Sequence, residues 1–340
     1  MPTNSECLAM AKSWYAHPKT RLRSMYFEGP PGVGKSALDG MLADHFEIPE
    51  GNRIIIRGSI RMPTDLLGIP YERDGLMHWA HPQELAQMMD TSQLWMLRLE
   101  ELPDSPQMMQ NAMCGILYDR EVGGVKFGPN VITTANGNRT EDRSGAGRII
   151  SKLSNRVAVI PYEVSLDDWI EWAISQALNM TTISFINWKG VSALFDFDPE
   201  RKVNATPRQW ELVSYIDESL PKNLFMGLVS GLIPEGLAVE YCAYKDMMGR
   251  LPSFQEIERN PREAQLPDGI DVSYAVTSRL VTGTQTVTQF ESLMQYVSRM
   301  AVEFQTLYIH ATYKRVPEIA AHPEYVRWCA KNAAYFGAAA

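Results

Sequence analysis

One short stretch near the N-terminus constrains this chain more than any other. Residues 26–37 read YFEGPPGVGKSA and fit the pattern G-x-x-x-x-G-K-[ST]. An apolar run precedes the stretch at residues 25–27, and a helical pattern of Leu, Met and Phe follows it to residue 46. A strand, a glycine-rich loop and a helix in this order form a cradle for phosphate groups. The complete motif and both flanks favour the cradle over an ordinary Gly/Pro turn.

The residue types in this loop assign a role to each position. The glycines let the backbone turn so that its N–H groups point at a β-phosphate, and Lys35 reaches the β and γ oxygens. Ser36 is expected to hold Mg²⁺ through its hydroxyl. We therefore expect ATP to be bound by the residues Gly29, Pro30, Pro31, Gly32, Val33, Gly34, Lys35, Ser36 and Ala37.

Length and composition bound the class of protein. A chain of 340 residues suggests about two domains. Its net charge of −8, without a run of Lys or Arg, gives no strong nucleic-acid signal. Four scattered cysteines without a C-x-x-C pair favour reduced thiols. Since we also see neither a signal pattern nor an apolar stretch free of charge, we expect a cytoplasmic protein without a membrane span.

A second informative strand is predicted at residues 93–102, QLWMLRLEEL, which end in two acids. P-loop ATPases place a metal-binding Asp and then a water-polarising Glu at this point. We expect Glu100 to hold the metal together with Ser36, and Glu101 to act on the attacking water. The alternative is a strand that merely ends in solvated acids.

The remaining pattern predicts the fold. Apolar strands alternate with helices up to about residue 163, which favours a parallel α/β sheet with its ligand at the strand tips. The β-branched run at residues 52–58 is typical of a strand buried on both faces. The strand at residues 130–138 ends near the polar residue Asn136, at the edge where a nucleotide is expected. Beyond residue 165 the pattern is helical.

These motifs, taken in order, resemble the AAA+ ATPases, and specifically the MoxR-type group. GPPGVGKS is similar to the Walker A loop, and LWMLRLEEL is similar to the Walker B strand. PTDLLGIP and the following LMHWAHPQEL resemble the small sheet that MoxR-type proteins insert into the second helix. REVGGVKF resembles the hairpin before the sensor 1 strand, and ITTANGN resembles that strand. The ordered match covers roughly residues 20–215.

The resemblance implies a fold and an organisation. It implies a P-loop AAA+ core with a five-stranded parallel sheet, followed by an α-helical lid and a further helical C-terminal region. The expected segments are residues 1–163 for the core, with the helix-2 insert at about 59–82 and the hairpin at about 120–127, residues 164–250 for the lid, and residues 251–340 for the helical extension.

The resemblance also implies a catalytic set. Besides Glu101, it places Asn136 at sensor 1 and Arg156 as an arginine finger that acts on the neighbouring subunit. Arg208, in the segment ATPRQ, is placed at sensor 2 at the start of a lid helix. Family members usually carry Asp where Glu100 stands, and octahedral Mg²⁺ is demanding about geometry. Slow hydrolysis is therefore one expectation.

Three functions follow as hypotheses. The first is an ATPase, using ATP and Mg²⁺, that forms a homo-oligomeric ring, expected to be a hexamer, and remodels a partner protein. The resemblance implies a partner of the von Willebrand factor A type. The second is a nucleic-acid motor similar to McrB-type GTPases or helicase loaders, although the insert offers only Arg61, Arg73 and His78. The third is a structural ring that binds nucleotide with weak turnover, motivated by Glu100.

Overall fold

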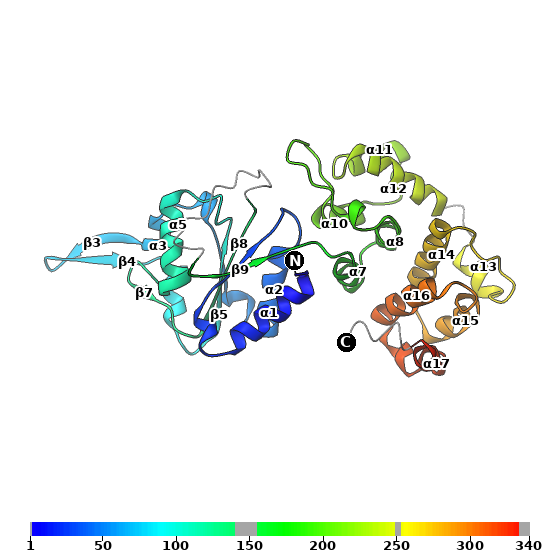
Figure 1. Ribbon diagram of the computed structural model, residues 1–340, viewed down its shortest axis with the longest axis horizontal. Coiled ribbons are helices and arrows are strands. Elements are labelled where there is room, and N and C mark those ends of the chain that lie inside the picture. The colour runs from blue at the N-terminus through cyan, green and yellow to red at the C-terminus, as the bar shows by residue number, and fades with distance from the viewer. Residues whose placement is uncertain (1, 140–154, 249–252, 333–340) are drawn as a thin grey trace. The chain divides into compact units, whose positions relative to one another are not determined.

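The computed structural model describes residues 2–139, 155–248 and 253–332, without the side chain of Asp271 (Figure 1). The chain forms two compact units. The first comprises Met1–Ser165 with Asp198–Glu200, and the second comprises Leu166–Phe197 with Arg201–Ala340. The predicted division of the helical part near residue 250, and the last eight residues of the predicted extension, lie outside the described residues. The distinction between a lid and an extension stays a prediction.

A five-stranded sheet organises the first unit. Its strands are β1 (Met25–Glu28), β2 (Arg53–Arg57), β5 (Trp95–Glu100), β8 (Val131–Gly137) and β9 (Ala158–Pro161). They lie in the order β2-β5-β8-β1-β9, and all neighbouring pairs are parallel. All the carboxyl ends therefore meet at one edge of the sheet. The α/β fold with a parallel five-stranded sheet and a following helical region is confirmed.

Strand β2 departs from expectation. Its run of isoleucines predicts a strand buried on both faces, but β2 stands at the edge of the sheet and Ile55 is 38% exposed. The prediction was wrong because a run of β-branched residues indicates only that a segment favours a β-strand. It does not indicate whether another strand or a helix covers that segment.

Helices and two hairpins make up the rest of the first unit where the structure describes it. The helices are α1 (Asn4–Ala16), η1 (Thr20–Leu22), α2 (Lys35–His45), η2 (Glu50–Asn52), η3 (Gly58–Ile60), α3 (Thr64–Leu67), α4 (Gln83–Ala86), η4 (Gln87–Met89), α5 (Gln107–Cys114) and the π-helical turn η5 (Gly115–Asp119). The hairpins are β3 (Ile69–Arg73) with β4 (Leu76–Ala80), and β6 (Glu121–Val122) with β7 (Val125–Lys126). Both hairpins lie within the predicted insert and the predicted hairpin segment. The β3–β4 hairpin extends away from the sheet (Figure 1).

The shorter hairpin is tied firmly to the core, in contrast to the longer one. Val122 and Val125 are buried in the cluster that also holds Met109 and Met113 of α5. Arg120, which enters the hairpin with φ 56°, donates hydrogen bonds to the carbonyls of Phe127 at 3.2 Å, Gly128 at 2.6 Å and Val131 at 2.6 Å. A buried guanidinium that satisfies three carbonyls fixes the path of the chain into β8.

The described part of the second unit is built from helices. They are α7 (Leu166–Ser175), α8 (Met180–Lys189), α9 (Val191–Leu194), α10 (Pro207–Ser214), α11 (Lys222–Ser230), α12 (Glu235–Met248), α13 (Phe254–Arg259), α14 (Ile270–Gly283), α15 (Val287–Val297), α16 (Val302–Arg315), η7 (Pro317–Ala321) and α17 (Pro323–Lys331). Aromatic side chains hold it together: Phe185 of α8 lies 5.7 Å from Trp210 and 5.3 Å from Tyr241, measured between ring centroids. Within the described ranges, no helix is both long and apolar enough to cross a membrane.

Candidate nucleotide-binding site

The loop between β1 and α2 has the backbone that its glycines predict. Gly32 and Gly34 have φ values of 75° and 99°, which side-chain-bearing residues rarely adopt. A Cβ added at Gly29 would lie 2.8 Å from the carbonyl oxygen of Tyr162, which follows β9. The loop therefore lies directly against Tyr162, and only glycine permits that approach. Helix α2 begins at Lys35, so its positive end faces the loop.

Lys35 lies within the loop that it is predicted to serve. Its Nζ donates hydrogen bonds to the carbonyls of Gly29 at 2.6 Å and Pro30 at 2.7 Å, and to Oδ1 of Asn138 at 3.0 Å. Asn138 follows the last residue of β8, and Gly137 of that strand accepts a 3.3 Å hydrogen bond from the Gly29 amide. The carboxyl end of β8 thus meets the loop through Asn138, a residue that the sequence analysis missed.

Ser36 and Glu100 meet at the same edge of the sheet. The hydroxyl of Ser36 donates a hydrogen bond of 2.8 Å to Oε1 of Glu100, the last residue of β5. Glu100 is only 7% exposed. The two residues nominated for the metal are brought together, and the longer Glu side chain reaches the serine directly. A hydroxyl and a carboxylate are oxygen donors of the kind that Mg²⁺ prefers, so this pair fits the ion by donor type.

Glu101 has an unusual backbone. Its φ of 59° places it in the left-handed region, which is uncommon for a residue with a side chain and is often found at functional sites. The hydroxyl of Ser105 holds the Glu101 carbonyl at 2.7 Å, and the hydroxyl of Ser59 donates to the Glu101 carboxylate. The turn after β5 is therefore fixed, and it sets the direction of the second acid.

A third acid stands in the same turn. Burial and the nearby Glu101 raise the pKa of Asp104, and the charge of Lys35 partly opposes that shift. The charge of Lys35 therefore acts on Asp104 as well as on the phosphate loop. Asp104 is a second candidate for proton transfer, and the sequence analysis did not nominate it.

Two arginines share the Glu100 carboxylate. Nε of Arg57, the last residue of β2, lies 3.0 Å from Oε2, and Nε of Arg98 lies 3.2 Å from Oε1. Nη1 of Arg98 also donates a 3.0 Å hydrogen bond to the carbonyl of Ser36. Parallel pairing of β2 and β5 sets Arg57 opposite Glu100, and alternation along β5 sets Arg98 on the same face as Glu100. Neither arginine was nominated from the sequence.

The side chain of Asn136 contacts helix α2. Its amide nitrogen lies 3.3 Å from Oδ2 of Asp39, and the same oxygen lies 3.8 Å from Nε of Arg98. Asp39 is 1% exposed, and this burial raises its pKa to about 6, against the opposing effect of Arg98. Asn136 is therefore joined to the metal candidate through Asp39 and Arg98, and its predicted sensor role stays a prediction.

Arg156 lies just before β9, at the amino-terminal edge of the sheet. Its Cζ stands 4.3 Å from the centre of the Tyr118 ring, which also has Arg23 at 5.0 Å. Register pairs Met25 with Ala158 and Glu28 with Pro161, so the phosphate loop lies at the opposite edge. Arg156 therefore does not belong to the loop of its own chain, and any action on a phosphate would concern another chain.

Arg208 belongs to the second unit. It follows Pro207, the first residue of α10, whose N-terminal cap is the hydroxyl of Thr206. A proline at this position starts a helix without losing a hydrogen bond. The predicted helix start is confirmed, and the predicted contact of Arg208 with a phosphate stays a prediction.

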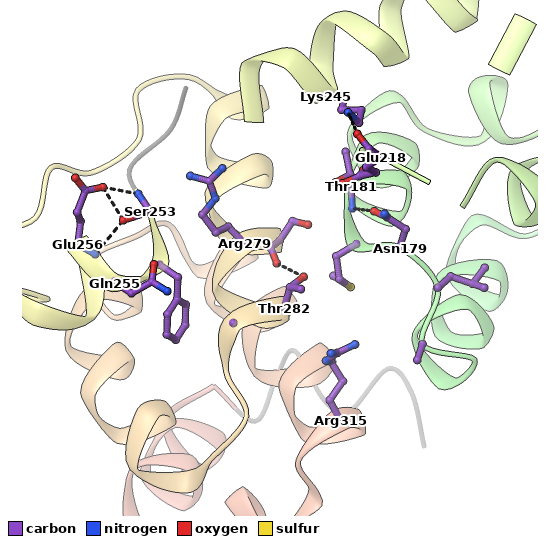
Figure 2. A pocket seen from close by; sticks show the side chains of 16 residues that line it. Asn179, Thr181, Glu218, Lys245, Ser253, Gln255, Glu256, Arg279, Thr282 and Arg315 are labelled. Carbon is purple, nitrogen blue, oxygen red and sulfur yellow. Dashed lines mark hydrogen bonds between the residues drawn. The ribbon is translucent and has the colours of Figure 1, made fainter. Parts of the chain in front are cut away.

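The second unit has a cavity of its own, of about 870 Å³ (Figure 2). Three basic residues line it, Lys245, Arg279 and Arg315, together with the acids Glu218 and Glu256. Burial lowers the pKa of Arg279, and Glu256 is engaged with Ser253 at the start of α13. The mixed charges select no ligand class, and no residue nominated from the sequence lines this cavity.

The chain matches no protein-family model and no curated protein. Among solved structures it is similar to the Holliday junction branch migration motor RuvB of Thermotoga maritima, with 13% identity, coverage of 87% of this chain and 86% of that chain, and a TM-score of 0.38. It is also similar to NtrX of Brucella abortus in complex with ADP, with 15% identity, coverage of 98% and 67%, and a TM-score of 0.38. PCH-2 of C. elegans gives 15% identity, coverage of 73% and 68%, and a TM-score of 0.33. Similarity this low carries no argument about function.

Proposed function

We propose that this chain is an ATPase that binds ATP in the loop of residues 29–37 and hydrolyses it with Glu101. The observation that carries the proposal is the junction of the loop with β5, where Ser36 and Glu100 are joined by a 2.8 Å hydrogen bond. The phosphates would replace the carbonyls and Asn138 as partners of the Lys35 ammonium. Mg²⁺, when bound by Ser36 and Glu100, would neutralise phosphate charge.

The chain's own residues would divide the remaining work. Glu101, fixed by its turn, would orient the attacking water, and Asn136 would fix the position of that water. We further propose that Arg208 contacts the γ-phosphate and that Arg156 acts on the site of a neighbouring chain. The location of Arg156 at the far edge of the sheet supports the second assignment, since it leaves that guanidinium outside its own site.

The family, the assembly state and the partner are part of the same proposal. The order of motifs supports a MoxR-type AAA+ protein that assembles as a hexameric ring, works in the cytoplasm and remodels a partner protein. A von Willebrand factor A-type partner rests on the resemblance alone. The β3–β4 hairpin supports partner binding, because Ile69, Leu76 and Met77 are 66%, 65% and 69% exposed. Large exposed apolar side chains that gather on one element mark interaction surfaces.

A second candidate is a ring that binds nucleotide with weak turnover. The observation that favours it is the pair of guanidinium groups on Glu100, because a metal-binding carboxylate with two organic cations nearby is a poorer ligand for Mg²⁺. ATP binding is common to both candidates. They differ in whether phosphate is released.

Titration with a fluorescent ATP analogue, followed by steady-state phosphate release, tests the proposal. Lys35→Ala should weaken binding at least about tenfold, since a charge-assisted contact contributes about 1.5–3 kcal/mol. Lys126→Ala is the matched control, because Lys126 is a solvated lysine of the same unit that pairs only with Glu121 at 3.6 Å among the ion pairs of the described chain. Equal affinity of Lys35→Ala and the wild type would remove the loop assignment. Binding without phosphate release would leave the second candidate.

A further inference from the structure

Two positively charged side chains, Arg57 and Arg98, lie against the Glu100 carboxylate. Oε1 accepts the Ser36 hydroxyl at 2.8 Å and faces Arg98 Nε at 3.2 Å, while Oε2 faces Arg57 Nε at 3.0 Å. Both oxygens of the Glu100 carboxylate therefore have a hydroxyl or guanidinium partner within the chain. The two arginines differ in setting, because the Arg98 side chain is 14% exposed and the Arg57 side chain is 53% exposed.

Because it is less exposed, Arg98 interacts with Glu100 more strongly than Arg57 does. A buried charge pair is screened less than a solvated one, so the charge of Arg98 acts on Glu100 more strongly than the charge of Arg57 does. Arg98 is also held from behind, because Asp39 Oδ2 lies 3.8 Å from its Nε and its Nη1 donates to the Ser36 carbonyl at 3.0 Å. The guanidinium thus touches the backbone of one metal candidate and the carboxylate of the other.

Arg98 also has room to move. A cavity of about 650 Å³ lies behind it, between α2 and the β2–β5 edge of the sheet, and it is lined by Arg98 and Asp39 among others. A Cβ added at Gly40, on the wall of this cavity, would meet no atom within 4 Å. Glu50 also lines it, so a displaced guanidinium would find an acidic group there, whereas Asp44 is paired with Arg53 at 2.7 Å.

We infer that Arg98 is a positioning residue that sets the magnesium requirement of this site, by neutralising Glu100 and by competing with Mg²⁺ for the place beside Ser36 and Oε1. A cation of charge +2 that enters between Ser36 and Glu100 is repelled by the guanidinium that already lies 3.2 Å from the same oxygen. Mg²⁺ binding therefore requires Arg98 to withdraw, and the Mg²⁺ concentration needed to strengthen nucleotide binding is correspondingly high. This inference rests on the proposed nucleotide site.

The test uses a fluorescent ADP analogue, which is not hydrolysed, and measures its affinity at a series of free Mg²⁺ concentrations. Arg98→Met removes the charge and keeps most of the side-chain volume. It should move the Mg²⁺ concentration at the midpoint downward by about 10–100-fold, the size of effect that groups surrounding metal ligands usually have. Arg98→Lys keeps the charge and should stay near the wild-type midpoint. Arg57→Met, which removes a solvated charge from the same carboxylate, should shift the midpoint less.

The outcomes separate the inference from the function on which it rests. If the wild type binds the analogue at no Mg²⁺ concentration, or if Lys35→Ala binds it equally well, the nucleotide site itself is wrong. If binding is intact and Arg98→Met leaves the midpoint unchanged or raises it, the site stands and the role of Arg98 is overturned. Should Arg98→Met fail to fold because Asp39 loses its cation, the double variant Arg98→Met with Asp39→Asn removes both charges. The Mg²⁺ midpoint of the double variant then decides whether Arg98 has the proposed role.

Discussion

The hydroxyl of Ser36 donates a 2.8 Å hydrogen bond to the carboxylate of Glu100, which joins the first turn of α2 to the end of β5. Strand β8 lies between β5 and β1, so the contact crosses one strand of the sheet. It depends on the parallel order of these strands, which brings both carboxyl ends to one edge. The proposed chemistry needs this meeting of a phosphate loop and an acid.

The acid that follows Glu100 should be required for turnover but not for binding. Glu101→Gln keeps the shape of the side chain and removes the carboxylate that would accept a proton. We expect it to bind the ATP analogue as the wild type does and to lose most phosphate release, by about 10²–10⁴-fold, the usual contribution of a general base. Stopped assays of phosphate release would measure the loss.

Asp104→Asn is the matched control for this experiment. Asp104 stands in the same turn and its pKa is raised by burial and by Glu101. If Asp104→Asn loses turnover while Glu101→Gln retains it, the two acids have been assigned the wrong way round.

The β3–β4 hairpin should be dispensable for folding. Leu76 and Met77 are 65% and 69% exposed, and surface substitutions away from special contacts usually change stability by no more than about 0.5 kcal/mol. We expect Leu76→Ser with Met77→Ser to keep the wild-type thermal midpoint and ATP affinity. Leu66→Ser, at a fully buried position in the preceding helix α3, should lower the midpoint clearly. A double variant that melts as early as Leu66→Ser would place the hairpin in the core and remove it as a partner surface.

Asp39 should give the protein a measurable dependence of stability on pH. Burial raises the pKa of this carboxyl from 3.8 to about 6, so the folded state holds a proton that the unfolded state has lost between these values. The contribution of Asp39 to stability is therefore largest below pH 4, falls as pH rises to about 6, and is constant above. The fall amounts to about 3 kcal/mol at 1.36 kcal/mol per pKa unit.

Thermal unfolding of the wild type and of Asp39→Asn between pH 4 and pH 7.5 would measure this contribution. The midpoint of Asp39→Asn minus that of the wild type should rise from pH 4 to about pH 6 and then level off. The change of this difference with pH is the informative quantity. Asp39→Asn also removes the acidic partner of Arg98, and this loss shifts the melting midpoint of the variant by the same amount at every pH. Two parallel curves would show that Asp39 keeps its ordinary pKa in the folded state.

The sequence predicted the parts of this site that are local. The phosphate loop is a continuous motif, and Glu100 and Glu101 follow directly from an apolar run, so a single stretch of chain contains each signal. Asn138, Arg98 and Asp39 gave no such signal. Their roles arise from contacts such as that of Lys35 with Asn138, which joins residues 103 positions apart.

The fold shows the same limit. Strands, hairpins and helix starts were predicted from patterns of a few residues, and Pro207 marked the start of α10 correctly. The exposure of Ile55 could not be predicted, because it depends on which strand ends at the edge of the sheet. The helical pattern beyond residue 165 did not give the break between α11 and α12, where Pro234 directly precedes α12.

Mixing two inactive variants tests most directly the claim that this is an ATPase whose site is completed by a neighbouring chain. Arg156→Ala should bind ATP nearly normally and hydrolyse it about 10³–10⁵-fold more slowly, whereas Lys35→Ala keeps Arg156 but has a loop that binds ATP weakly. In a one-to-one mixture, about a quarter of the head-to-tail interfaces pair an intact loop with an intact Arg156. We predict that phosphate release rises well above that of either parent, and that wild-type turnover per chain falls on dilution. A mixture no more active than its parents, with wild-type turnover per chain unchanged down to monomeric concentrations, would contradict the account.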